Sequence, residues 1–507
     1  MIYIGKEALT IERLIQVARF NEKVELDEVG KKNILESNAR LERIVVEGKP
    51  VYGINTGFGI FADKKIKPEE ISKLSRNLII SHAVGTGEPL SAEVTRAAML
   101  VRANTLTRGY SGVRIQIVET LLEMLNKGIT PVIPSQGSLG SSGDLCQLSH
   151  MALVFTRDDK DLEEESGWAE YQGKVLRGKT AMELARISRI QLGAKEGLAI
   201  NNGATFSAAL GAFSVWEGEY LMKLADQSMA LSLEALIGCS AAFDARLHDA
   251  RGQLGQIASA TEIRKMIAES TLIDCTDRVQ DAYSLRCAPQ IHGSVRDTLQ
   301  HVKRVVEIEL NAATDNPLLF EPDVALSGGN FHGEPVGMVL DFLSIALCEL
   351  GAIAERRVFR LTDEKLNQGL PPMLVDSIEA AGLNSGVMMP QYTAASLVLE
   401  NQTLATPDSV HSLPTSAEQE DHNANAMTAA RHCWMILQNV QHILSIELFV
   451  AARAADLRLR LTKDGKLGTG TKVLHDRIRK EIPYEADDRL WGPQIENVKL
   501  LVKDHVL

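Results

Sequence analysis

The stretch YLMKLADQSMALSLEALI, residues 220–237, decides the fold that this sequence predicts. It contains neither glycine nor proline, and its apolar side chains recur at close to the 3.6-residue period of an α-helix. The residues of this apolar stripe are Leu221, Leu224, Met229, Leu231 and Leu236. Stretches of similar character cover residues 336–361, 388–404 and 426–459. Segments of this length predict long helices packed side by side as a bundle, and their broad apolar stripes indicate burial on several faces, including faces against other subunits.

The composition is typical of a large soluble globular protein. Of the 507 residues, 45% are hydrophobic and 24% are charged, which leaves enough apolar material for a large core and excludes disorder and collagen. Only 5% are aromatic, and a chain rich in alanine and leucine with few aromatic residues favours helix over sheet. We therefore predict a mainly α fold.

Charge and cysteine usage exclude several classes of partner and compartment. The formal net charge is −12 and no basic patch is evident, so we expect neither a nucleic acid nor an anionic membrane surface as a partner. The first residues carry Lys6 and Glu7 where a secretory signal needs an apolar run, and no stretch reaches about 18 uncharged apolar residues. The six cysteines form no CxxC pair and are expected to be free thiols. These features predict a cytoplasmic protein that does not span a membrane.

Glycine and proline gather in loops, and these loops divide the chain. The clusters lie at residues 53–59, 131–143 and 327–335. Together with a change of composition near Glu196, they predict two domains. Residues 1–196 form a loop-rich N-terminal domain, and residues 197–507 form the long-helix bundle with the C-terminal helices.

The most unusual local sequence is GSLGSSGDLCQLSH, residues 137–150. A plain interpretation is a Gly/Ser turn that enters a helix, with Asp144 near the N-cap. A phosphate-binding loop is excluded, because the glycine spacing fits neither the Walker nor the dinucleotide pattern. A hydrolase nucleophile elbow is excluded because G-x-S-x-G does not occur here.

A chemical interpretation remains for Ser141-Ser142-Gly143. Gly143 lacks the Cβ that would hinder its nitrogen from approaching the carbonyl carbon of Ser141. A tight bend would let this nitrogen attack that carbon, and loss of water from the ring and from Ser142 would leave a methylidene-imidazolone. Such a ring is an electrophile made from the chain itself.

This segment resembles the Gly-Ser-x-Gly-Ala-Ser-Gly-Asp-Leu signature of the histidine/phenylalanine ammonia-lyase family, whose prosthetic group is that ring. Further blocks match the family in order along most of the chain. They are YGINTGFG from Tyr52, SHAVGTGEPL from Ser81, INNG from Ile200, QDAYSLRCAPQ from Gln280, TDNPL from Thr314, GGNFHGEP from Gly328 and TSAEQEDH from Thr415. The resemblance implies a homotetramer with a long-helix bundle of the ammonia-lyase (fumarase/aspartase-like) type. It also implies that the N-terminal domain carries the ring-forming triad and that each pocket takes residues from several subunits.

The resemblance assigns roles to single residues. In the family, the ring takes up the substrate's amine while a tyrosine removes the β-proton. That tyrosine corresponds to Tyr52, on a glycine-flanked loop that acts as a lid, and Tyr283 corresponds to a tyrosine near the ring. Arg286 corresponds to the arginine that clamps the substrate carboxylate. The other matched residues are Asn202 and Gln280, which hold the ring oxygen or the amine and carboxylate, Phe331, which packs beside the ring, and Asp144, which assists cyclisation.

Two further blocks bear on the choice of substrate. Ser81-His82 and Gln419-Glu420-Asp421-His422 correspond to sequences of the histidine branch of the family. A carboxylate that faces an imidazole accepts its N–H, which a benzene ring does not offer. Glu420 and His82 therefore predict a small amino acid substrate that bears an imidazole ring.

Several residues near the expected site depart from the family's pattern. Ser141 stands where alanine is usual, and because it contributes only its carbonyl carbon and α-carbon to the ring, cyclisation stays chemically possible. Cys146-Gln147-Leu148-Ser149 replaces Ala-Pro-Leu-Ala, and Asn423-Ala424-Asn425 replaces Val-Ser-Met. These changes add polar groups that need partners when buried, and they leave open a substrate more polar than histidine.

We predict an ammonia-lyase that converts L-histidine to trans-urocanate with a ring formed from Ser141-Ser142-Gly143. Three alternatives stay open. The first is an aminomutase that returns the amine to the β-carbon, and the second is a lyase that releases trimethylamine from a trimethylated thiol-histidine without the ring. The third is a non-catalytic helical scaffold that binds an imidazole compound or a partner. No metal is expected, because the sequence shows neither HExxH nor Cys/His clustering.

Overall fold

The structure is a computed structural model that describes residues 1–57 and 64–507. Its packing divides the chain into two compact units. Unit 1 comprises residues 1–214, 302–341 and 407–431, and unit 2 comprises residues 215–301, 342–406 and 432–507. The boundary predicted near Glu196 falls inside the first segment of unit 1. The division into domains over residues 1–196 and 197–507 stays a prediction.

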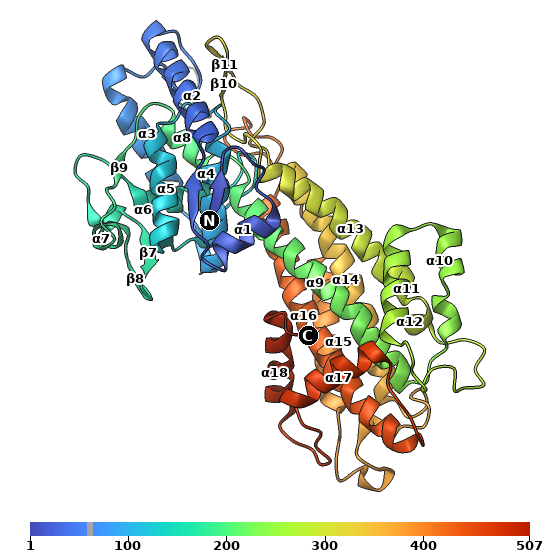
Figure 1. Ribbon diagram of the computed structural model, residues 1–507. Coiled ribbons are helices and arrows are strands. Elements are labelled where there is room, and N and C mark those ends of the chain that lie inside the picture. Colours follow the sequence, from blue (N-terminus) through green and yellow to red (C-terminus); the bar gives the residue numbers. More distant parts are fainter. Residues whose placement is uncertain (58–63) are drawn as a thin grey trace. The chain divides into compact units, whose positions relative to one another are not determined.

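Long helices dominate the fold (Figure 1). They are α9 (Thr205–Ala235), α13 (Ala288–Glu309), α14 (Glu334–Thr362), α15 (Met388–Leu404) and α16 (Ala426–Leu461). The four stretches that predicted long helices lie in α9, α14, α15 and α16, so these predictions and the mainly α fold class are confirmed. Neither α13 nor the 20-residue helix α2 (Glu28–Glu47) was predicted from the sequence.

Further helices and small sheets complete unit 1. Its other helices are α1 (Ile11–Ala18), α2 (Glu28–Glu47), α3 (Ile71–His82), α4 (Ala92–Leu106), α5 (Ile115–Lys127), α6 (Leu145–Phe155), α7 (Gly178–Leu184) and α8 (Glu196–Asn201), with the 3₁₀ turns η2 (Pro68–Glu70) and η3 (Glu163–Glu165). Its parallel strand pairs are β1 (Ile2–Ile4) with β2 (Val24–Leu26) and β6 (Thr156–Arg157) with β9 (Ile190–Gln191). Its antiparallel pairings are β3 (Thr86–Pro89) with β5 (Pro134–Gln136), β10 (Leu318–Phe320) with β11 (Val324–Leu326), and β7 (Trp168–Tyr171) with both β4 (Thr130–Pro131) and β8 (Lys174–Arg177).

Shorter helices also surround the long ones in unit 2. They are α10 (Ala245–Arg251), α11 (Leu254–Met266), α12 (Tyr283–Arg286), α17 (Thr469–Glu481) and α18 (Trp491–Lys503), with the 3₁₀ turns η4 (Ser240–Phe243), η5 (Pro372–Leu374) and η6 (Ile378–Ala380).

Buried charges join the long helices inside unit 2. Arg357 of α14 forms a two-pronged ion pair with Glu447 of α16, and neither side chain is exposed to solvent. His292 of α13 lies 2.7 Å from Asp226 of α9, and both side chains are fully buried. These pairs connect helices that are far apart in the sequence and satisfy charges that would otherwise be costly to bury.

Two helices of the described chain, α14 and α16, are long and apolar enough by length and composition to cross a membrane. However, 61% and 72% of their most apolar windows are buried inside the protein. Burial of this kind is typical of the central helices of a bundle, which are apolar around most of their circumference.

Candidate active site

The Ser141-Ser142-Gly143 segment forms a tight turn directly before α6. Gly143 has a φ of +79°, and its nitrogen donates to the carbonyl oxygen of Gly140 at 3.3 Å. A Cβ on Gly143 would lie 2.0 Å from the carbonyl carbon of Gly203, so only glycine fits here without a shift of the backbone. The nitrogen of Gly203 also donates to the carbonyl oxygen of Ser142 at 3.0 Å. The neighbouring backbone therefore holds the turn closely.

Asp144 is fully buried at the end of this turn. It is the N-cap residue of α6, as predicted, but its side chain makes no capping bond to that helix. Its carboxylate instead accepts from the backbone nitrogen of Ser207 at 2.8 Å and from the hydroxyl of Ser138 at 3.2 Å. Burial raises the pKa of Asp144, and these hydrogen bonds oppose the rise. Because Ser207 lies in the first turn of α9, Asp144 fixes the start of that helix to the turn.

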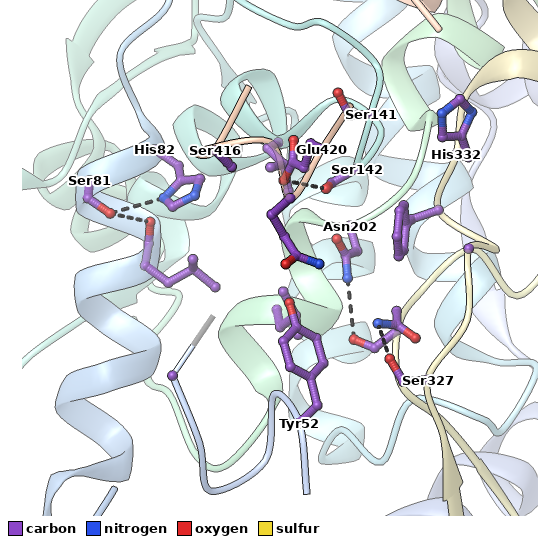
Figure 2. A pocket seen from close by; sticks show the side chains of 18 of the residues that line it. Tyr52, Ser81, His82, Ser141, Ser142, Asn202, Ser327, His332, Ser416 and Glu420 are labelled. Atoms are coloured by element: carbon purple, nitrogen blue, oxygen red, sulfur yellow. Dashed lines mark hydrogen bonds between the residues drawn. The ribbon is translucent and has the colours of Figure 1, made fainter. Parts of the chain in front are cut away.

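A cavity of about 1380 Å³ lies over the turn, within unit 1. Its walls come from α3, the turn at residues 141–145, the end of α8, and the loops at residues 327–332 and 416–422. The structure brings into this cavity the following residues that the sequence analysis singled out: Tyr52, His82, Ser141, Ser142, Asn202, Phe331 and Glu420. Figure 2 shows how the labelled members of this group face the cavity.

Glu420 faces the ring-forming turn. The hydroxyl of Ser142 donates to a carboxylate oxygen of Glu420 at 3.4 Å (Figure 2). The backbone of Glu420 pairs with Thr415, whose nitrogen donates to the Glu420 carbonyl oxygen at 2.8 Å. The carboxylate is thus carried by a closed loop rather than by a helix, and it points at the residue whose Cβ would become the methylidene carbon.

His82 ends α3 on another wall of the cavity. Its Nδ1 lies 3.0 Å from the hydroxyl of Ser81 (Figure 2). Burial lowers the pKa of His82, and the backbone of Leu78 and the charge of Glu420 oppose this effect only in part. The imidazole is therefore neutral near pH 7.

Tyr52 lies in a turn at the entrance of the predicted glycine-rich loop. Figure 2 shows its ring pointing into the cavity, on the side opposite the backbone that carries Ser141. Gly53 has a φ of +70°, and a Cβ there would lie 2.6 Å from a methyl group of Leu198, so the turn depends on glycine. The predicted loop at residues 53–59 is described as far as Gly57, and residues 58 and 59 lie outside the described residues.

Asn202 follows α8 and is almost fully buried. Its side-chain amide donates to the carbonyl oxygen of Asn316 at 3.3 Å. Arg102, which has no exposed surface, donates to the carbonyl oxygens of Ala199 and Asn202 and so holds the end of α8. Burial lowers the pKa of Arg102 to about 10, which leaves the guanidinium charged at neutral pH.

The structure places three predicted site residues elsewhere. Gln280, Tyr283 and Arg286 belong to unit 2 and are not among the described residues that line this cavity. Tyr283 and Arg286 lie at either end of the short helix α12. Tyr283 is 69% exposed, and the Arg286 guanidinium lies 4.5 Å from the centre of its ring. The two side chains form a cation–π pair in which the tyrosine is exposed and the arginine is partly buried.

The chain resembles known proteins over nearly its whole length. The family model described as aromatic amino acid lyase matches residues 9–480. The chain belongs to the aromatic amino acid lyase family. This lyase is 48% identical over 491 residues to a histidine ammonia-lyase of Caldanaerobacter subterraneus subsp. tengcongensis, with 96% of this chain and 94% of the relative covered.

Solved structures of the family show the same fold. The crystal structure of histidine ammonia-lyase from Trypanosoma cruzi matches this lyase with a TM-score of 0.90 at 36% identity, covering 100% of this chain and 94% of that one. A tyrosine aminomutase from Streptomyces globisporus matches with a TM-score of 0.92 at 34% identity, covering 99% and 97% of the two chains. The expected ammonia-lyase fold is therefore confirmed, and the ammonia-lyases among its relatives make this protein a carbon–nitrogen lyase.

The residues of this aromatic amino acid lyase fit a ring made from its own backbone. A Cβ at Gly143 would overlap the backbone of Gly203, so this position requires glycine. The nitrogen that would close the ring therefore has no side chain beside it. Ser142, whose Cβ would become the methylidene carbon, faces the cavity rather than the core. Among residues 1–57 and 64–507, by contrast, no group of three or more His, Cys, Asp and Glu side chains is arranged to hold a metal ion.

The sequence analysis did not single out several residues that the structure adds to the site. His332 follows Phe331 in the cavity wall, and its Nε2 lies 3.1 Å from the carbonyl oxygen of His422. Asn316 lines the cavity too, and its side-chain oxygen accepts from the nitrogen of Gly328 at 2.8 Å. Both lie inside sequence blocks that resemble the family, so these blocks could have identified them as site residues.

Proposed function

We propose that this lyase is a histidine ammonia-lyase, which eliminates ammonia from L-histidine to give trans-urocanate. The observation that carries the proposal is the position of Glu420, which faces both the ring-forming Ser142 and the neutral His82 in one cavity. A carboxylate and a neutral imidazole can both hydrogen-bond the polar edge of an imidazole ring, and neither gains from a benzene ring. The 48% identity to a histidine ammonia-lyase supports the same substrate.

Ser141, Ser142 and Gly143 would form the ring, which would supply an electrophilic carbon for the substrate's amine. Tyr52, which projects into the cavity, removes the β-proton as general base. Asn202 holds a polar group of the ring or substrate, Phe331 packs beside the ring, and Asp144 stabilises the turn during cyclisation. Glu420 and His82 orient the imidazole.

We further propose a homotetramer in which another copy of the chain supplies Gln280, Tyr283 and Arg286. The cavity of about 1380 Å³ exceeds the roughly 300–1,000 Å³ typical of small-molecule sites, so one histidine leaves room for side chains from a second chain. Tyr283 is exposed and the Arg286 guanidinium stacks on its ring, and an arginine of this kind has the chemistry to bind a carboxylate. Large apolar side chains also stay exposed on the long helices, as in Phe342 and Ile345 of α14 and Leu399 of α15, which favours burial between subunits. The expected compartment is the cytoplasm.

An aminomutase is the second candidate, because the fold matches a tyrosine aminomutase with a TM-score of 0.92. The two activities differ in the fate of the amine, which an aminomutase returns to the β-carbon of the same molecule.

Two measurements on the purified protein test the proposal. The intact mass should be lower than the sequence mass by two waters, and incubation with L-histidine should yield urocanate, followed by its ultraviolet absorbance. A β-amino acid as the main product would show that the protein is an aminomutase and not a lyase. An unmodified mass together with release of trimethylamine from a trimethylated thiol-histidine would overturn the ring and point to direct elimination. An unmodified mass with no turnover would leave only a binding scaffold.

A further inference from the structure

The hydroxyl of Ser141 has a buried partner on a distant segment. The side-chain amide of Asn423 donates to the Ser141 hydroxyl at 2.5 Å, and the two residues are only 1% and 6% exposed. The orientation of this amide follows from its other bond, because the nitrogen of Leu413 donates to the Asn423 side-chain oxygen at 3.3 Å. The Nδ2 group must then face Ser141.

Asn423 also closes the loop that carries Glu420. Its backbone nitrogen donates to the hydroxyl of Ser412 at 2.8 Å, so both ends of the segment 412–423 meet at this residue. Two residues further on, the nitrogen of Asn425 donates to the carbonyl oxygen of Leu139 at 2.8 Å. The loop is therefore anchored to the residues before Ser142 from one side, while Glu420 reaches Ser142 from the other.

The anchor depends on the two side chains that depart from the family's pattern. Alanine at position 141 has no oxygen to accept the bond, and valine at position 423 has no amide to donate it. A buried polar group without its hydrogen-bond partner destabilises the fold, so neither departure is favourable without the other.

We propose that Asn423 is a positioning residue that, through Ser141, sets the place of the Glu420 carboxylate over the ring-forming turn. This inference rests on the proposed role of Glu420 in binding an imidazole ring. Asn423 does not touch the reacting atoms, and its effect passes through the loop at residues 412–423. The pair thus tunes substrate recognition by means of a serine that the ring chemistry itself does not require.

The test uses the full-length enzyme with Asn423→Val, Ser141→Ala and the double variant. Ser149→Ala is a matched control, because the Ser149 hydroxyl accepts from the buried amide of Asn201 at 3.3 Å in the same unit. Equilibrium binding of urocanate measures recognition without turnover. Amide hydrogen exchange of the segment 412–423 measures the anchor itself, whatever the enzyme binds.

Each single variant should weaken urocanate binding by about 5- to 30-fold, which corresponds to the loss of one buried hydrogen bond. The double variant should bind urocanate at least as tightly as the single variant with the lower affinity, because both changes break the same hydrogen bond. In the Glu420→Gln background, Asn423→Val should change the affinity less than about two-fold, since Asn423 acts through Glu420. Exchange in segment 412–423 should accelerate in both single variants and stay unchanged in Ser149→Ala.

Unchanged exchange in Asn423→Val overturns the inference even if the protein binds no urocanate. An equal loss of affinity in the Glu420 and Glu420→Gln backgrounds overturns it as well. Failure of the proposed function is recognised separately, by an unmodified intact mass or by the absence of urocanate as a product of the wild type.

Discussion

Ser142 and Glu420 are separated by 278 positions in the sequence, yet the hydroxyl of the first donates to the carboxylate of the second at 3.4 Å. This distance is longer than the range of about 2.5–3.0 Å usual for an O–H···O hydrogen bond, so the contact is weak. It places Ser142, which is proposed to form the electrophile, beside Glu420, which is proposed to recognise an imidazole ring. In that proposal, chemistry and recognition meet at one loop contact.

Replacing Glu420 by glutamine should lower kcat/KM much more for substrates with an imidazole ring than for substrates with a benzene ring. The amide keeps the shape but loses the charge that makes a carboxylate a strong acceptor for an imidazole N–H, which costs about 1.5–3 kcal/mol or roughly 10- to 150-fold in kcat/KM for histidine. Steady-state kinetics with histidine and phenylalanine measure the two losses. An equal loss of kcat/KM for both substrates would show that Glu420 does not recognise the imidazole ring.

The substitution Gly143→Ala should block ring formation. A Cβ at this position would overlap the backbone of Gly203 at 2.0 Å, and the φ of +79° is strained for alanine. Mass spectrometry of the intact variant should then show no loss of water. Gly492→Ala at the start of α18 is the matched control, because a Cβ there meets no atom within 4 Å. A fully dehydrated Gly143→Ala protein would contradict the assignment of this nitrogen to the ring.

Helix periodicity predicted much of the fold, and the exception has a physical reason. Helix α13 has Pro289 as its second residue and carries many charged side chains, so its helical periodicity was not recognised in the sequence. Its buried residues Val295, Leu299, Val302 and Val306 nevertheless recur at helical spacing along a narrow stripe. A count of apolar spacing, rather than of apolar content, would have found this helix.

The site was predictable only where its residues lie in recognisable blocks of sequence. The turn at residues 141–143, His82 and Glu420 fall in such blocks, and the structure brings them together. The bond between Ser141 and Asn423 spans 282 positions and joins two residues that looked like independent departures. No local pattern contains such a pairing, because it arises only when the loop at residues 412–423 packs against the turn.

Glu309, at the end of α13 in unit 1, should make stability depend on pH near neutrality. Burial raises its pKa from 4.5 to about 7, with Arg102 opposing and Asp144 adding to the rise. Because the folded pKa lies above the unfolded one, the stabilising contribution is complete below pH 4.5 and is lost as the pH rises through 7. The variant Glu309→Gln cannot ionise, so it should gain stability over the wild type as the pH rises from 5 to 8.

Urea unfolding at both ends of this pH range measures the effect of Glu309. The midpoints of wild type and Glu309→Gln should lie close together at pH 5 and separate at pH 8, with the variant more stable. Glu25→Gln, which changes an exposed residue of β2, should follow the wild type throughout. A constant difference between Glu309→Gln and wild type across the range would show that the carboxyl does not titrate there.

Removing one partner of the buried Arg357–Glu447 pair should destabilise unit 2 strongly. Both side chains are fully buried, and Arg357 Nη2 donates to Glu447 at 2.8 Å. The variant Arg357→Met leaves the buried carboxylate of Glu447 without its guanidinium partner, although the hydroxyl of Ser232 still donates to it, at a cost of about 3–5 kcal/mol in the free energy of unfolding. The double variant Arg357→Met/Glu447→Leu removes both charges and should regain most of that loss, because apolar side chains of similar volume can replace a buried pair at little net cost. Denaturant unfolding of the wild type and the two variants measures the free energies of unfolding. A double variant that is even less stable than Arg357→Met would contradict the prediction.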